Sequence, residues 1–594
     1  MRQCADLIFE YLKNIGVSDV FMLTGGGAMY LIDSLGRSGI NYVCCHHEQS
    51  AAIAAQAYSM YDERLGVCLV TTGPGGTNAL TGAAAAYMDS SPVLFISGQV
   101  KRGDFADKRG VRQFGAQEND ILAMAKPITK YAVCVTDETR VLYEIEKAVY
   151  IATHDRKGPV WVDIPLDVQS AMVDERLLEH FKERTEFNSD EILTAISNTA
   201  DLLKSAERPL FLVGHGILAS KSEKDFINLA NELKIPVLTT WRALSLFDYE
   251  DKLFFGSPGL QAPRYSNLIL QSCDLLIVLG SRLDNMITAF NENNFAKSAK
   301  KIIIDIDFKE LSKFKIPNTT IINADVKDFI TEIRNFASKI NTDKFARWTD
   351  NCLKVKENFP IWKEKQVCEK NVDLYKAALE ISQNCTNNDC VVISSTSRCN
   401  TAGHIAFKHK AGQRCISSMG FGSMGFALPS VIGAYYASNK QRVIMLEGDG
   451  SFQLNLQELQ TIVSYKIPAK MFIFSNRGYA AIATMQDRNF DGRHVGSDKN
   501  SGVSMPDLKK IACAYNIPYF CINSDNEIIS IVREVMSING AVICEIAGDM
   551  SFDEIPKCIS YVDKNGQRVS APLENPFPFL QEDELLEIIG CLKN

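Results

Sequence analysis

The chain has 594 residues, 46% of them hydrophobic and 23% charged, so it is too long for one core and too apolar for a disordered or fibrous protein. A formal net charge of −8, with no basic stripe in the sequence, excludes nucleic acid as a main partner and favours a small-molecule ligand. No apolar run could span a bilayer and the chain starts as an amphipathic helix, so we expect no membrane partner and a cytoplasmic location.

Residues 1–170 alternate short apolar runs with polar or Gly-rich turns. Four runs, at 20–23, 41–45, 66–70 and 92–96, each end in such a turn before a helical stretch. This pattern predicts an α/β domain with a doubly wound parallel sheet, whose site-forming loops lie along one edge. The Gly turns also suggest a dinucleotide site. Because no GxGxxG follows the first run, we do not expect an NAD site.

Two charged stretches, 171–190 and 341–372, are expected to connect this domain to two further α/β domains. Residues 190–340 and 372–548 repeat the alternation of apolar runs with helical patterns, so the predicted fold has three doubly wound parallel-sheet domains. The last segment, 549–594, is rich in proline and ends in a short helical pattern. We expect it to lie as a tail over the functional site.

The third domain contains the most informative stretch. Residues 442–446 predict a buried strand that stops at the Gly-rich turn 447–450, and a second apolar strand runs from 471 to Asn476 after a helix. The two strands are parallel, so their carboxyl ends lie at the same edge of the sheet and Asp449 should approach Asn476. An Asp-Gly turn in an ordinary βαβ unit is the alternative interpretation.

Three groups at this edge have the ligand chemistry of a magnesium site. Asp449, Asn476 and the carbonyl of Gly478 offer hard oxygen donors, too few to enclose a cation alone, which suits Mg²⁺ shared with a diphosphate. Gly450 and Ser451 open the following helix and would direct backbone N–H groups at the phosphate oxygens.

The Asp449–Asn476 spacing resembles the thiamine diphosphate signature of the pyruvate decarboxylase and acetolactate synthase superfamily. The resemblance covers nearly the whole chain. Further matches are His47-Glu48-Gln49, Gly73-Pro74-Gly75, the Ala-Tyr-Met-Asp-Ser run at 86–90, and Gly422-Ser423-Met424-Gly425. The motifs at 24–29 (TGGGAM), 112–115 (RQFG) and 570–574 (SAPLE) resemble those of acetolactate synthase-like proteins of bacterial surface-polysaccharide pathways.

The resemblance implies thiamine diphosphate and Mg²⁺ as cofactors, with specific roles for matched residues. Glu48 would hydrogen-bond pyrimidine N1′, the Gly422 carbonyl would accept from the 4′-amino group, and Met424 would hold the cofactor bent. A helix-capping Glu and a core Met are the structural alternatives. The expected cofactor-binding set is Glu48, Gly73, Gly422, Met424, Asp449, Gly450, Ser451, Asn476, Gly478 and Tyr479, with Asp449, Asn476 and Gly478 on the metal.

The resemblance also implies a shared active site. Glu48 and the diphosphate site meet across a dimer interface in the family, so we expect a homodimer or homotetramer. Gly27 and Gln117 match positions that face the reacting carbon, and together with Glu48 they form the expected catalytic set. A turn glycine and a surface amide are the alternatives.

The expected activity is decarboxylation of a 2-oxo acid donor such as pyruvate, with carboligation of the two-carbon unit to an acceptor carbonyl. Acetolactate synthases carry Trp, Lys and Phe where this chain has Met485, Leu166 and Ala116, which predicts a larger and more neutral acceptor pocket. A nucleotide-linked keto sugar is one candidate acceptor. Acetolactate synthesis from two pyruvates, simple decarboxylation and a non-catalytic homologue remain alternatives. The last alternative rests on residues 395–399, where the family has Gly-Gln-His.

FAD remains an open question at this stage. Residues 256–259 and 305–307 match those near the flavin in FAD-binding relatives, but the Gly-Met-His-Gly run of those relatives is missing. An occupied site and a vestigial one are both compatible with the sequence.

Overall fold

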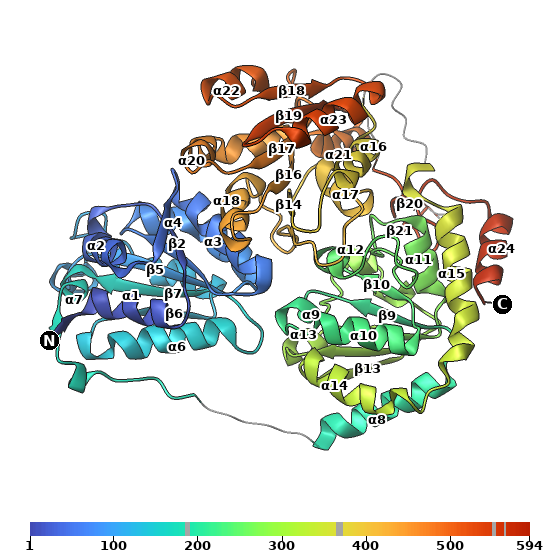
Figure 1. Cartoon of the computed structure of the whole chain (residues 1–594), viewed down its shortest axis with the longest axis horizontal. Helices are drawn as coiled ribbons and strands as arrows, with labels where there is room; N and C mark the ends of the chain where they lie inside the picture. Colours follow the sequence, from blue (N-terminus) through green and yellow to red (C-terminus); the bar gives the residue numbers. More distant parts are fainter. Residues whose placement is uncertain (184–189, 364–371, 549, 551–553, 563–565, 594) are drawn as a thin grey trace.

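The computed structural model describes residues 1–183, 190–363, 372–548, 550, 554–562 and 566–593 (Figure 1). It contains three parallel sheets, each flanked by helices, in the N-terminal, middle and C-terminal parts of the chain. The predicted fold class, three doubly wound α/β domains, is confirmed. Within the described residues, no helix combines the length and the apolar character needed to cross a membrane.

The N-terminal and C-terminal sheets share one topology. When the six strands of each are numbered along the chain, both sheets run 2-1-3-4-6-5 and all neighbours are parallel. The N-terminal strands are, in spatial order, β3 (Asn41–Cys44), β2 (Asp19–Met22), β4 (Gly66–Val70), β5 (Val93–Gln99), β7 (Val160–Pro165) and β6 (Tyr131–Cys134). The C-terminal strands are β15 (Cys415–Ile416), β14 (Cys390–Ile393), β16 (Val443–Gly448), β17 (Ala469–Ser475), β19 (Val542–Ala547) and β18 (Tyr519–Ile522).

Helices connect these strands in both domains. The N-terminal helices are α1 (Cys4–Asn14), α2 (Met29–Ser38), α3 (Glu48–Asp62), α4 (Pro74–Met88), α5 (Ile121–Ala125), α6 (Val141–Thr153) and α7 (Leu166–Gln169). The C-terminal helices are α16 (Leu374–Gln383), α17 (Arg398–Ile405), α18 (Ala427–Ala437), α19 (Asp449–Phe452), α20 (Glu458–Ser464), α21 (Ala480–Phe490), α22 (Leu508–Ala514) and α23 (Ile528–Ser537). Strands such as β16 are buried along their whole length, as expected for parallel strands covered on both faces.

The middle domain has a five-stranded parallel sheet. Its strands are, in spatial order, β10 (Val237–Thr239), β9 (Pro209–Val213), β11 (Leu275–Leu279), β12 (Lys300–Asp305) and β13 (Thr319–Asn323). Its helices are α8 (Asp190–Ser205), α9 (Gly216–Ala219), α10 (Glu223–Leu233), α11 (Arg264–Ser272), α12 (Asn285–Thr288), α13 (Phe308–Ser312), α14 (Val326–Ala337) and α15 (Ala346–Asn358). Two short antiparallel pairs complete the strands: β1 (Arg2–Gln3) with β8 (Met172–Val173), and β20 (Ser560–Val562) with β21 (Arg568–Ser570).

The two outer domains pack on each other through α3 and α18, which lie side by side in Figure 1. One apolar cluster runs through both domains and includes the alanines of α3. The helix backbones approach so closely that a Cβ on Gly433 of α18 would lie 2.0 Å from the carbonyl oxygen of Ala54. A glycine is therefore required at this crossing, and the position of α3 depends on the C-terminal domain.

The structure corrects three expectations, two about segments outside the sheets and one about the end of a strand. The stretch 341–372 is more than a connector, because α15 buries Trp348, Cys352 and Val355 against the middle domain. The tail does not lie over the site along its length, because α24 (Glu582–Lys593) packs on α11 and α15. The predicted strand end also moves: β16 continues through Gly448 and helix α19 begins directly at Asp449.

Candidate active site

The strand order identifies where ligands should bind in the C-terminal domain. Its first and third strands, β14 and β16, are neighbours. The chain continues from β14 to β15 at one edge of the sheet and from β16 to β17 in the direction of the other edge. Open α/β sheets bind ligands in the crevice beyond the carboxyl ends of such strands. The loops at this point are residues 394–397 after β14 and Asp449 after β16.

Asp449 and the segment after β17 come together at this edge. The Asp449 carboxylate is 2% exposed and accepts hydrogen bonds from the Gly450 amide at 2.8 Å and the Arg477 amide at 2.5 Å. Burial raises the pKa of Asp449 to about 6, although these backbone bonds oppose the shift. The sequence prediction that the two strand ends meet agrees with these bonds.

Asn476 supplies the observation that points to a bound cation. Its side-chain oxygen is buried and finds no hydrogen-bond partner among the described residues. A buried amide oxygen without a donor is costly, and a metal ion would satisfy it. Among the described residues, no group of three or more His, Cys, Asp or Glu side chains could hold a metal ion by itself. A cation here would need the Asn476 oxygen, the carboxylate of Asp449 and ligand oxygens, so the residues fit Mg²⁺ held with a diphosphate.

The residues around Asp449 shape the rest of this edge. A Cβ on Gly450 would lie 2.5 Å from the ring of Tyr479, so only glycine lets this ring pack on the turn. Ser451 Oγ accepts a hydrogen bond from the Gly425 amide at 2.8 Å. A Cβ on Gly478 would lie 2.6 Å from the Ser497 carbonyl oxygen. These contacts hold the predicted diphosphate-side residues in one rigid unit.

The segment with Gly422 and Met424 borders the same crevice. Gly422 has φ +69°, and a Cβ at that position would lie 3.9 Å from the carbonyl oxygen of Ser395, in the loop after β14. Met424 is half-buried and lies next to Gly425, whose amide is bonded to Ser451. The structure therefore brings the predicted pyrimidine-side and diphosphate-side residues of this domain to one strand edge.

The N-terminal domain has the equivalent switch point between β2 and β4. Gly27 follows β2 and donates its amide hydrogen bond to Thr71 Oγ1 at 3.1 Å, while a Cβ on Gly27 would lie 1.9 Å from Thr72 Oγ1. Gly73 follows β4 with φ +69°, and a Cβ there would lie 2.3 Å from the carbonyl oxygen of Gln117. Gly27, Gly73 and Gln117 thus lie around one sheet edge, as predicted.

Glu48 is the first residue of α3 and is 8% exposed. Asn78 of α4 donates a hydrogen bond to Glu48 Oε2 at 3.0 Å. Two hydrogen bonds fix the start of this helix. The Gln49 amide donates to the capping His47 Nδ1 at 3.1 Å, and the His46 amide donates to Glu458 of the C-terminal domain at 3.0 Å. The sequence analysis missed Asn78. Its position one turn into the helix after Gly73 was the available signal.

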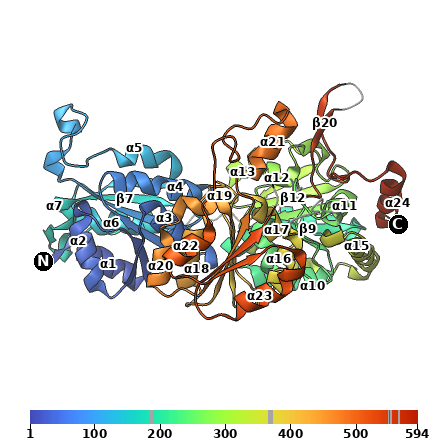
Figure 2. The same cartoon turned by 90° about the horizontal axis from the view of Figure 1, so that it is seen from above.

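The three acceptor-side positions do not come together in one chain. Met485 is 58% exposed and lies in helix α21, which the alanines at 480, 481 and 483 favour. Leu166 begins α7 and Ala116 is exposed in the N-terminal domain. Figures 1 and 2 both place α7 at the outer end of the N-terminal domain, far from α21. A pocket lined by both therefore needs a second copy of the chain.

Arg398 is the first residue of α17, directly after the loop at 394–397. Its side chain is 3% exposed, and Nη2 donates to Thr484 Oγ1 at 3.0 Å and to the Met550 carbonyl at 2.7 Å. A Cβ on Gly478 would also lie 3.5 Å from the side chain of Met550, so the first part of the tail does reach the site. The Arg398 guanidinium therefore joins α21 to the first part of the tail, at the residue before Met485.

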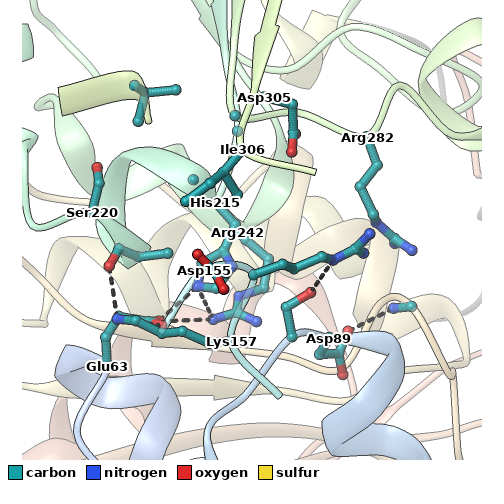
Figure 3. A pocket seen from close by; sticks show the side chains of 18 of the residues that line it. Glu63, Asp89, Asp155, Lys157, His215, Ser220, Arg242, Arg282, Asp305 and Ile306 are labelled. Atoms are coloured by element: carbon teal, nitrogen blue, oxygen red, sulfur yellow. Dashed lines mark hydrogen bonds and ion pairs between the residues drawn. The ribbon is translucent and has the colours of Figure 1, made fainter. Parts of the chain in front are cut away.

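Apart from these strand edges, a cavity of about 840 Å³ lies between the N-terminal and middle domains (Figure 3). It is bordered by turns at the carboxyl ends of β9, β11 and β12, including Gly280-Ser281-Arg282 and Asp305-Ile306. Residues 256–259, which the sequence analysis connected with a flavin, do not line it. The cavity matches the location and size of a nucleotide site.

A buried ionic cluster closes one side of this cavity. Glu63, directly after α3, accepts from His215 Nε2 at 2.6 Å and faces Arg242 and Lys157, each at 3.7 Å. Burial would raise the pKa of Glu63, but these neighbours together hold it below its usual value, so the carboxylate stays ionised. Figure 3 shows these side chains converging on Glu63.

Comparisons with known proteins agree with this geometry. Residues 2–124 match the model "Thiamine pyrophosphate enzyme, N-terminal TPP binding domain", residues 196–333 the central domain, and residues 396–546 the C-terminal TPP binding domain. The acetolactate synthase large subunit of Porphyra purpurea is 31% identical over 552 residues, covering 91% of this chain and 90% of its own. Acetolactate synthase 1, chloroplastic, of Zea mays is 31% identical over 92% of this chain and 85% of its own.

Proposed function

Because the chain belongs to the thiamine diphosphate (thiamine pyrophosphate) enzymes of the acetolactate synthase-like family, we propose that it decarboxylates a 2-oxo acid such as pyruvate and ligates the two-carbon unit to an acceptor carbonyl. The buried, unbonded oxygen of Asn476 beside Asp449 is the observation that carries the proposal to this chain's own residues. When bound, thiamine diphosphate supplies the carbanion chemistry that this reaction needs.

The C-terminal strand edge would hold the cofactor's charged end. Asp449, Asn476 and the Gly478 carbonyl would bind Mg²⁺, and the metal would be shared with the diphosphate oxygens. The Ser451 amide would donate to the same oxygens from the start of helix α19, and the Gly450 amide would join it by exchanging its present bond to Asp449 Oδ1 for one to the diphosphate. This arrangement would fix the diphosphate and shield its metal-bound end from water, because Asp449 and Ser451 are buried.

The N-terminal edge would act on the other end of the cofactor. Glu48 would hold or move a proton at pyrimidine N1′, with Asn78 orienting the carboxylate. The Gly422 carbonyl would accept from the 4′-amino group, and Met424 would support the bent shape. Gly27 and Gln117 would face the reacting carbon, where Gln117 donates a hydrogen bond to the substrate.

Two variants test this assignment. Glu48→Gln should bind thiamine diphosphate with Mg²⁺ normally in calorimetric titration but lose about 10²–10⁴-fold in pyruvate turnover, since it removes only the proton-transfer group. Asp449→Asn should lose cofactor binding. Equal turnover in Glu48→Gln and wild type would refute the assignment. No saturable cofactor binding by the wild type would instead support a non-catalytic homologue.

The same proposal also specifies the chemical class of the acceptor. A nucleotide-linked keto sugar is the acceptor we propose, supported by the smaller or uncharged side chains Met485, Leu166 and Ala116. Since α7 and α21 are far apart in one chain, a pocket lined by both would require a homodimer, which we propose with it. Product analysis with pyruvate and candidate acceptors tests it. Rapid acetolactate formation from pyruvate alone would identify an ordinary acetolactate synthase.

A nucleotide in the middle-domain cavity is a second proposal, with FAD the first occupant to test. The supporting observation is the 840 Å³ cavity at the strand ends, with Arg282, Arg242 and Asp305 on its wall. Flavin absorbance near 450 nm in the purified protein would support FAD. Protein without it that also takes up no added FAD would show that the cavity holds no flavin.

A further inference from the structure

The loop before α5 is folded around one carboxylate, that of Glu118. Glu118 Oε1 accepts from the Ala106 amide at 2.5 Å, and Oε2 accepts from the amides of Phe114 and Gly115, both at 3.0 Å. Burial would raise the pKa of Glu118, but these three N–H groups hold it below its usual value. The ionised side chain therefore joins the two ends of a loop that projects from the domain in Figure 2.

The residue before Glu118 needs such support. Gln117 has φ +65°, in the left-handed region that side chains other than glycine seldom adopt. Its carbonyl oxygen lies against Gly73, where a Cβ would come within 2.3 Å. A strained backbone of this kind persists only where its surroundings fix it, and such positions are concentrated at functional sites.

The other side of Gln117 is fixed as well. The carbonyl of Asn119 accepts from Gln99 Nε2 at 3.1 Å, and the same nitrogen donates to Asp163 Oδ2 at 3.1 Å. Asp163 is buried in β7, so this contact attaches the chain after Gln117 to the sheet. The chain before Gln117 is held by the Glu118 side chain, which accepts hydrogen bonds from the amides of residues 106, 114 and 115.

We propose that Glu118 is a positioning residue for the proposed reaction, on which this inference rests: its carboxylate holds the loop that presents Gln117 to the substrate. Glutamine cannot replace it. One of its two acceptor oxygens would become an NH₂ donor facing backbone N–H groups, so at least one of the three bonds is lost. Aspartate keeps the charge but is one methylene shorter, so it should keep only part of the set.

The loop can be tested without any activity measurement. Amide hydrogen exchange of Ala106, Phe114 and Gly115 should be about 10–100-fold faster in Glu118→Gln, because a hydrogen-bonded amide must open before it exchanges. Asp107→Asn is the matched control: it removes one negative charge from the same loop, where the Asp107 carboxylate accepts from the neighbouring Lys108 amide at 2.7 Å. Unchanged exchange in Glu118→Gln would overturn the proposal, whether or not the protein decarboxylates 2-oxo acids.

A double-mutant cycle then tests whether Glu118 acts through Gln117. Glu118→Gln and Gln117→Ala should each lower pyruvate turnover by about 10–100-fold, and the double variant should lose no more than the worse single one. Cofactor affinity and the thermal midpoint should stay close to wild type, with Glu118→Asp intermediate in turnover. Losses that multiply in the double variant would overturn the proposal. An inactive wild type would refute the proposed function. The hydrogen-exchange experiment would then still test whether Glu118 holds the loop.

Discussion

Removing the side chain of Asn78 should slow the enzyme by weakening its hold on Glu48. Asn78 Nδ2 donates to Glu48 Oε2 at 3.0 Å, and this carboxylate is 8% exposed. A hydrogen bond to a charged group contributes about 1.5–3 kcal/mol, and each 1.4 kcal/mol is a factor of ten. If this bond orients Glu48 only for its catalytic role, Asn78→Ala should lower turnover by about 10–100-fold.

The assay separates orientation of Glu48 from loss of the cofactor. Pyruvate turnover is measured at saturating thiamine diphosphate and Mg²⁺, and calorimetry gives the cofactor affinity of the same samples. Thr77→Val is the matched control, because Thr77 Oγ1 on the same helix bonds the carbonyls of Gly73 and Pro74 at 3.4 and 3.3 Å. Turnover within about twofold of wild type in Asn78→Ala, or an equal loss in Thr77→Val, would refute the reasoning.

Three further predictions concern assembly, packing and pH. If the site is shared between subunits, Glu48→Gln and Asp449→Ala chains mixed as dimers should recover about a quarter of wild-type turnover, whereas a site within one chain would recover none. Gly433→Val should lower the free energy of unfolding in urea by about 1–3 kcal/mol or more, because its Cβ would lie 2.0 Å from the Ala54 carbonyl oxygen; a midpoint equal to that of wild type would contradict this. His494 bonds Asp498 at 2.6 Å and Asp487 at 2.8 Å, and these carboxylates raise its pKa above 6.5. The contact is complete below pH 6.5 and is lost as pH rises through the folded pKa, so proteolysis between 494 and 503 should accelerate with pH in wild type but not in His494→Gln.

The sequence by itself determined the fold class and the sheet edges along which the candidate site residues lie. Its apolar runs each end in a polar or Gly-rich turn, and in a parallel sheet those turns share one edge. This local rule was enough to predict that Asp449 and the segment at Asn476 meet, as the Arg477 amide bond to Asp449 shows. The same rule predicted that Gly27 and Gly73, which each follow a strand, lie at one edge of the N-terminal sheet.

Only the tertiary structure decided contacts between elements that no local pattern connects. The bond from Asn78 to Glu48 depends on how α3 and α4 pack, and the burial of Arg398 depends on α21 and the tail. The tail itself follows the middle domain, because α24 packs on α11 and α15 there. Hydrophobic periodicity states which face of a helix is buried, but not against which partner. Side-chain pairs across separate elements are therefore fixed by packing, after the local sequence has specified the elements.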